Sequence, residues 1–234
     1  MTEDDLVDSF GLALPRGWND LPLEQEPFDQ FIEETVDGLR DRGLSAPDRR
    51  MLELLARQVR GLLIAQGAVM ARWVSVLAPR DESADPGDLE LFAAAAVLTS
   101  RHRQDFDAPK PLTPELLVRA LGREAPDPDE RVDLEPAQIV TLPAGRAVRT
   151  VRLLRESQPA GPPSETFAQT YVVPFDAGER LCTLHLATPR VDLGGQCSSM
   201  FDAVAQTLRL FRGSDPTTFS APGPSDGGPG DSRV

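Results

Sequence analysis

The chain contains few of the residue types that most often carry catalysis or bind metals. Its 234 residues include two cysteines, two histidines and one tyrosine. The thiols and imidazoles stand at Cys182, Cys197, His102 and His185, without the closely spaced ligand pairs that structural zinc sites use. The sequence therefore predicts no metal site.

The sequence motifs that bind nucleotides are missing as well. The chain has no G-x-G-x-x-G motif and no P-loop. Gly194 and Gly195 precede an expected helix, but no lysine follows them, and we interpret them as the point where a strand is released into that helix. We expect no cofactor and no enzyme activity, although the 37 acidic residues leave general acid–base catalysis open.

Long apolar runs and a surplus of cations are also lacking. The longest apolar run, at 91–98, is too short to span a bilayer, and the N-terminal residues 1–10 lack the charged and apolar regions of a signal peptide. The formal charge is −13, whereas nucleic acids and anionic membranes require clustered cations. We expect a cytoplasmic protein with no membrane insertion, no nucleic-acid partner and reduced thiols, with a disulfide between the two cysteines left open.

What is present indicates helices and strands followed by a polar tail. Residues 1–8 read as an acidic lead, 9–212 as one domain, and 213–234 as a disordered tail rich in glycine, proline and serine. The expected elements are a strand at 10–14, helices at 28–42 and 45–66, strands at 68–77 and 89–99, a short helix at 113–121, strands at 132–142, 147–154, 166–175 and 180–188, and a closing helix at 198–211.

The order of these elements predicts an α+β fold. Because most of the strands are joined by hairpins, the sheet should be mostly antiparallel and should lie between helices. In the strand at 166–175, four large apolar residues at odd positions define a buried face. The closing helix is expected to bury Leu208 and Phe211 on its apolar side.

The strand at 180–188 contains both a cysteine and a histidine, which are the residue types of a nucleophilic catalytic pair. Cys182 and His185 differ in parity on that strand, so their side chains should point to opposite faces. A nucleophilic pair between Cys197 and His185 stays open as an alternative, because the loop that connects them can bring the two side chains together. We interpret His185 as a half-buried strand residue and both cysteines as small apolar side chains.

Arginines recur at every third position along one strand, at Arg146, Arg149, Arg152 and Arg155. On a strand they alternate, so Arg149 and Arg155 share one face while Arg146 and Arg152 share the other. They can serve as a docking strip for an acidic partner or for acidic segments of this chain, or as solvated arginines that discourage edge-to-edge aggregation. We take these four as the candidate partner-binding residues.

Several short motifs resemble those of a known superfamily. The residues are the Leu-Pro-Arg-Gly-Trp of 14–18, Leu-Pro-Ala-Gly of 142–145, Tyr-Val-Val-Pro of 171–174, 184–189, and Phe-Asp-Ala-Val-Ala-Gln-Thr-Leu of 201–208. Over roughly 9–212 the chain resembles actinobacterial members of the PsbP-like superfamily. That superfamily includes Ran-binding Mog-type proteins and chaperone-adaptors of type VI secretion effectors. The resemblance implies an antiparallel sheet between helical layers and non-catalytic binding of other proteins.

Together these observations predict a non-catalytic protein-binding adaptor or chaperone associated with a bacterial secretion or injection system. Its partner would be another protein, such as a secreted effector or a component of the secretion machine. Two alternatives stay open. The chain is a small-ligand-binding protein or enzyme with a pocket between sheet and helices, or it is a structural subunit of a larger assembly.

Overall fold

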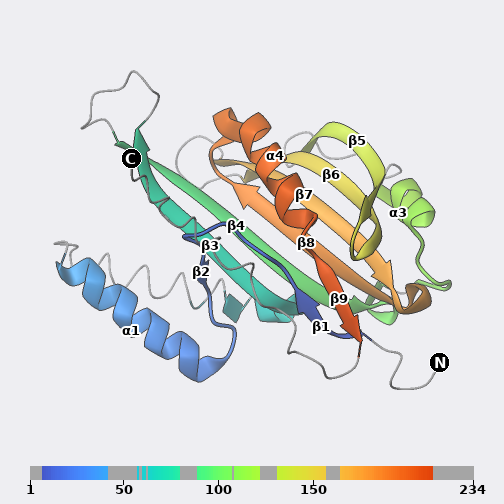
Figure 1. The fold of residues 1–234 in the computed structure, drawn as a ribbon, viewed down its shortest axis with the longest axis horizontal. Coiled ribbons are helices and arrows are strands. Elements are labelled where there is room, and N and C mark those ends of the chain that lie inside the picture. Colours follow the sequence, from blue (N-terminus) through green and yellow to red (C-terminus); the bar gives the residue numbers. More distant parts are fainter. Residues whose placement is uncertain are drawn as a thin grey trace, which may run out of the picture.

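One long antiparallel sheet forms the body of the protein (Figure 1). The computed structural model describes residues 7–41, 57, 60–61, 63–79, 89–106, 108–121, 131–156 and 164–212. Neighbouring strands all pair antiparallel, in the order β2-β3-β4-β8-β7-β6-β5. The strands are β2 (Asn19–Asp20), β3 (Ala68–Pro79), β4 (Leu89–His102), β5 (Arg131–Leu142), β6 (Gly145–Glu156), β7 (Ser164–Phe175) and β8 (Arg180–Thr188).

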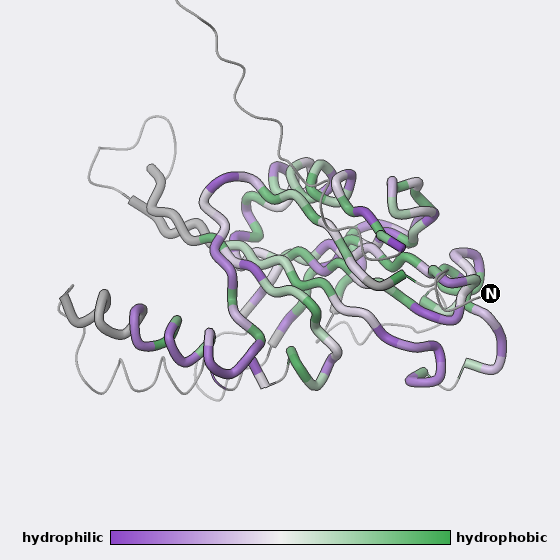
Figure 2. Tube along the Cα trace, turned by 60° about the horizontal axis from the view of Figure 1, so that its bottom comes forward, coloured by the Kyte–Doolittle hydropathy of each residue, from purple (hydrophilic) through white to green (hydrophobic). Residues whose placement is uncertain are grey.

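Helices lie on both sides of this sheet. Helix α4 (Gly194–Ala205) packs on one face, against β7 and β8, and α3 (Pro114–Leu121) contacts β5, β6 and β7. Helix α1 (Gln25–Asp41) lies near the β3 side, apart from α4 (Figure 1). Its coloured part is mostly hydrophilic, whereas apolar residues gather in the sheet (Figure 2). The predicted α+β class, the antiparallel sheet and the helices at 28–42 and 113–121 are confirmed.

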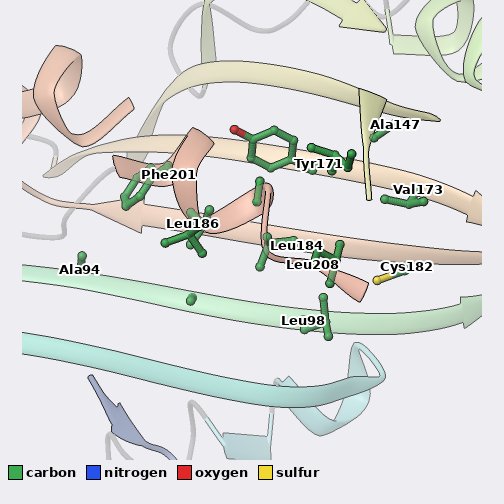
Figure 3. Close-up of a cluster of buried hydrophobic side chains, with 14 of the residues drawn as sticks. Ala94, Leu98, Ala147, Tyr171, Val173, Cys182, Leu184, Leu186, Phe201 and Leu208 are labelled. Atoms are coloured by element: carbon green, nitrogen blue, oxygen red, sulfur yellow. The ribbon is translucent and has the colours of Figure 1, made fainter. Parts of the chain in front are cut away.

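The hydrophobic core fills the space between the sheet and α4. In β7 the odd positions Phe167, Tyr171, Val173 and Phe175 are buried, as the alternation predicted. Leu184, Leu186 and Phe201 join them from β8 and α4 (Figure 3). We call this side of the sheet the core face and the opposite side the second face.

The prediction of a closing helix at 198–211 is wrong for its C-terminal part. Helix α4 ends at Ala205, and residues 209–212 form strand β9 (Arg209–Arg212), which pairs antiparallel with β1 (Val7–Gly11) in a separate two-stranded sheet. The Thr207 hydroxyl donates to the Ala13 carbonyl (3.0 Å) and accepts from the Ala13 amide (2.9 Å). This contact with the N-terminal segment favours the turn, and Leu208 is buried beside α4 without being helical.

The N-terminal strand also differs from its predicted position. It was predicted at 10–14 but begins at Val7, which is buried within the segment interpreted as an acidic lead. Residues 1–6, the tail at 213–234 and most of the helix predicted at 45–66 lie outside the described residues. Of that helix, residues 57, 60–61 and 63–66 are described, and all but residue 66 are helical. The guanidinium groups of Arg57 and Arg60 lie over the Phe28 ring of α1, at 5.9 and 5.1 Å.

Candidate protein-binding face

The four candidate arginines divide between the two faces of β6, as their parity predicted. Arg149 lies on the core face, beneath α4. Arg155 pairs with Glu165 of the adjacent strand at 2.9 Å. The described structure therefore does not bring the four side chains into one continuous strip.

Arg149 connects β6 to α4 and β5. Its guanidinium donates to the Asp202 carboxylate (3.0 Å), the Glu135 carboxylate (2.5 Å) and the Ser198 hydroxyl (3.0 Å). The side chain is only 11% exposed. A cation held by two carboxylates and a hydroxyl in this way positions a helix on a sheet, and it has little surface left for a partner.

A polar cluster extends this contact into the core. Gln169 donates to Asp202 at 2.8 Å and its carbonyl accepts from Ser198 at 2.8 Å, while the Tyr171 hydroxyl also donates to Asp202. Burial, reinforced by the hydrogen bond to Asp202, raises the pKa of Tyr171 above its ordinary value. The tyrosine therefore stays protonated as a hydrogen-bond donor and holds α4 in place.

Arg146 and Arg152 lie on the second face. Arg146 pairs with Glu115 of α3 at 2.6 Å, and Arg152 pairs with Asp133 of β5 at 2.8 Å. The Arg146 side chain remains 59% exposed. Of the two readings of these arginines, pairing with acidic residues of this chain is what the described contacts show. Their role toward a partner stays a prediction.

The second face contains small and medium-sized uncharged side chains. The cross-strand register places half-buried residues of β4, β7 and β8 side by side on it. Among the described helices, α3 lies at the β5–β6 end of this face, and Pro27 in the first turn of α1 lies at its β3 end. The half-buried residues are Ala95, Val97, Thr170, Val172, Thr183, His185 and Ala187.

His185 lies at the centre of this face. Its Nδ1 is 2.9 Å from the Thr170 hydroxyl on the neighbouring strand. Burial, helped by the positive charge of Arg152, lowers the pKa of the His185 imidazole. The imidazole is therefore neutral at neutral pH and available for hydrogen bonding.

The two cysteines lie in the core and not beside His185. Cys182 is fully buried on the core face, and Cys197 packs in the same hydrophobic cluster. Burial raises the pKa of Cys182 to about 12, and burial together with the charge of Asp192 raises that of Cys197. The predicted opposite orientation of Cys182 and His185 is confirmed. The Cys197–His185 pair that the sequence left open is not formed, because the sheet lies between them.

A cavity of about 300 Å³ lies at the β3 end of the second face. It is bounded by the segment that leads into α1 and by β3, and that segment is held to the strand by a hydrogen bond from the Leu21 amide to the Ala71 carbonyl (2.9 Å). Leu23, Val69 and Ala71 supply apolar lining, and the carboxylates of Asp20 and Glu24 add charge. Asp20 is paired with Arg72 of β3 at 2.6 Å.

A second cavity, of about 220 Å³, lies at the other end, between α3 and strands β5 and β6. Val118 of α3 and Ala137 of β5 line it together with Thr150 and Arg152 of β6. The sequence left a pocket between sheet and helices open, but it did not locate either cavity. The available signal was the even-numbered set of small and hydroxyl residues in β7, opposite the large odd-numbered ones, which distinguishes an open face from a filled one.

No helix in the described part of the chain is long and apolar enough to cross a membrane. Among the same residues, no three or more histidine, cysteine, aspartate or glutamate side chains are grouped so that they could hold a metal ion.

Comparison with known proteins assigns no family to this chain. No protein-family model matches the chain. A stretch of 99 residues is 30% identical to N-succinylarginine dihydrolase of Pseudomonas syringae pv. syringae (strain B728a), covering 42% of this chain and 22% of that enzyme's length. Among solved structures, LpqN of Mycobacterium tuberculosis, which is involved in cell envelope biogenesis, is similar with a TM-score of 0.44 and 12% identity, over 88% of this chain and 86% of that chain.

Proposed function

We propose that this protein is a non-catalytic adaptor or chaperone that binds a segment of another protein on the second face of its sheet. The observation that carries the proposal is the difference between the two faces. The core face is filled by α4, β1 and β9, whereas the second face leaves uncharged side chains of three adjacent strands half exposed. Partly exposed apolar surface of this kind is typical of protein interaction sites.

The finer parts of the proposal follow from the sequence. The architecture would be of the PsbP-like type, and the partner a secreted effector or a component of a secretion or injection machine. Work in the cytoplasm fits the two unpaired, buried thiols of Cys182 and Cys197. Of the four arginines, Arg146 and Arg152 would belong to the partner surface because they lie on the second face, while Arg149 would hold α4.

Site-specific cross-linking in the native host tests this proposal. A photo-reactive amino acid replaces Thr183 on the second face or, as the control, the exposed Gln196 of α4. The expected result is one dominant protein cross-linked from position 183 and absent from position 196. That protein is then purified and titrated against the intact chain by calorimetry.

Two variants decide whether the contact is specific. Thr183→Arg should weaken the reconstituted complex at least about tenfold, because it places a charge in an uncharged contact surface, and Gln196→Arg should leave it unchanged. Circular dichroism confirms that both variants are folded. Equal affinity of the two variants, or cross-linking from position 196 alone, would refute protein binding on the second face.

A small-ligand-binding protein or enzyme is the second candidate, and the 300 Å³ cavity favours it. Its volume falls at the lower end of the range for ligand pockets, and it combines apolar walls with two carboxylates. A metabolite screen by thermal shift tests this candidate. A hit that is lost in Glu24→Gln but retained in Glu33→Gln would support it over the adaptor.

A further inference from the structure

The two cavities are connected by a single cross-strand row of residues on the second face. Ala71 lines the first cavity and is the register partner of Val97, which pairs in turn with His185. His185 pairs with Thr170, and Thr170 with Thr150, which lines the second cavity. The row crosses five adjacent strands, so its ends are separated by four inter-strand steps, or about 19 Å.

We infer that the partner segment binds in an extended conformation across the strands along this row, with one apolar side chain in each cavity. The inference rests on the proposed protein-binding function and specifies its ligand. An extended chain advances about 3.3 Å per residue, so the two anchor side chains would be about six residues apart. Both cavities are large enough to take a leucine or phenylalanine side chain.

The chemistry of the row favours an extended segment over a helix. An extended peptide lying across a sheet brings its own unpaired amide and carbonyl groups, which need hydrogen-bond partners when water is displaced. The Thr170 hydroxyl and the imidazole of His185, both half-buried on neighbouring strands, offer such groups. An apolar helix has satisfied its backbone internally and gains nothing from these polar side chains.

The charge around the first cavity indicates that the bound segment has a basic residue next to the side chain that enters this cavity. Asp20 is neutralised by Arg72, and nearby Arg60 donates to the Leu23 carbonyl at 2.9 Å and to Gln25. Glu24 then remains as an exposed carboxylate in the lining. At the other cavity Asp133 and Glu135 are paired with arginines of β6.

The charge of the whole molecule favours the same ligand. The net charge of −13 attracts basic segments from a distance and speeds their association. The inferred ligand is therefore an extended apolar segment with lysine or arginine beside the anchor at the β3 end.

Selection from a random peptide library displayed on phage tests this inference on the intact chain. The expected peptides contain two large apolar residues about six positions apart, with lysine or arginine beside one of them. Selected peptides are then synthesised and titrated by fluorescence anisotropy. Peptides whose anchors are about 13 positions apart would indicate a helical ligand, because a helix advances 1.5 Å per residue, and would overturn the inference.

Matched variants locate the anchors. Val69→Asp in the first cavity and Ala137→Asp in the second should each weaken peptide binding at least about tenfold. Phe106→Asp is the control, because Phe106 is 45% exposed, as Val69 is 47% exposed, and lines neither cavity. Glu24→Gln should weaken the binding of lysine-containing peptides and lower its salt dependence, whereas Glu33→Gln on α1 should do neither.

The inference and the proposed function can fail separately. If the selected peptides bind Val69→Asp and Ala137→Asp as tightly as the wild-type chain, the extended mode across the row is wrong. A partner that still cross-links from position 183 and is still weakened by Thr183→Arg would then leave the adaptor function standing. Loss of that cross-link together with failure to select any peptide would refute both the extended binding mode and the adaptor function.

Discussion

Individual side chains in this protein have roles that their sequence spacing does not reveal. Arg149 and Arg155 share a face of β6, yet Arg149 is 11% exposed between two carboxylates, while Arg155 forms a surface pair with Glu165. We predict that Arg149→Met lowers the free energy of unfolding by about 1.5–3 kcal/mol, because it leaves the Asp202 carboxylate and Ser198 hydroxyl of α4 without their charged hydrogen-bond donor. Arg155→Met should cost about 0–1 kcal/mol.

Urea denaturation followed by circular dichroism measures both values. Methionine keeps the apolar stem of arginine, so the comparison isolates the loss of the guanidinium group. Equal losses in the two variants would contradict the assignment of Arg149 as the residue that holds α4 on the sheet.

His185 makes stability depend on pH. Its pKa is lowered in the folded state by burial and by the charge of Arg152. A lowered folded-state pKa means that the unfolded chain binds the proton more tightly. The contribution of the neutral imidazole is therefore complete above the unfolded-state pKa, about 6.5, and is lost as the pH falls from there through the lowered folded-state pKa.

His185→Asn should remove this pH dependence, because its amide can still hydrogen-bond to Thr170 but does not titrate. The measurement is the free energy of unfolding in urea from pH 7.5 downward, in steps, for both proteins. Asp29, Glu115 and Asp192 also have lowered pKa values, but as carboxylates they act in a separate, more acidic range. A variant that follows the wild-type curve at mildly acidic pH would contradict the role of His185.

At the scale of elements, the β7–β8 hairpin depends on one glycine. Gly178 has a φ of +86°, and a Cβ there would lie 2.5 Å from the Leu112 carbonyl oxygen. The same stretch is held to the hairpin by a hydrogen bond from the Leu112 amide to the Gly178 carbonyl (2.9 Å). The hairpin therefore positions the chain that enters α3, at one border of the second face.

Substitution of this glycine tests that connection. Gly178→Ala should cost about 3 kcal/mol or more, because it combines backbone strain with a clash against backbone atoms. Gly145→Ala is the matched control, with a φ of +128° but no atom closer than 3.7 Å, and should cost about 1–3 kcal/mol from strain alone. Hydrogen exchange should also rise in α3 for Gly178→Ala. Equal costs would contradict the close contact.

At the scale of the whole molecule, β5 is an edge strand of the described sheet, and its sequence bears on assembly. The β5–β6 register shifts between Asp133 and Glu135 and again between Glu135 and Gln138, and Pro136 lies inside the second shift. Proline and bulges discourage pairing of an edge strand with another chain. This arrangement favours a monomer over the structural-subunit alternative.

Light scattering after size exclusion measures this directly. The wild-type chain should keep the mass of one chain as its concentration rises, and Pro136→Val should increase in mass because an amide donor returns to the edge. A wild-type mass of two or more chains at every concentration would favour the structural subunit and contradict the monomer.

The sequence by itself determined the elements whose burial pattern is local. The four strands of the C-terminal half, the β3–β4 hairpin and helices α1 and α3 follow from alternation, helical periodicity and capping, because each pattern is contained in its own segment. The opposite orientation of Cys182 and His185 follows from parity in the same way. Pairing of the arginines with acidic residues of the same chain was among the readings that the sequence left open, and the structure shows it.

Only the tertiary structure decided features that join distant segments. Apolar residues at 201, 204, 205, 208 and 211 suit one continuous helix, and contacts from Thr207 to Ala13 and from β9 to β1 end that helix at Ala205. The cavities and the row between them depend on the strand order that brings Ala71 and Thr150 to the two ends of one face. Such features combine residues far apart in the sequence, 194 positions for Ala13 and Thr207, and local periodicity contains no information about which distant strands pair.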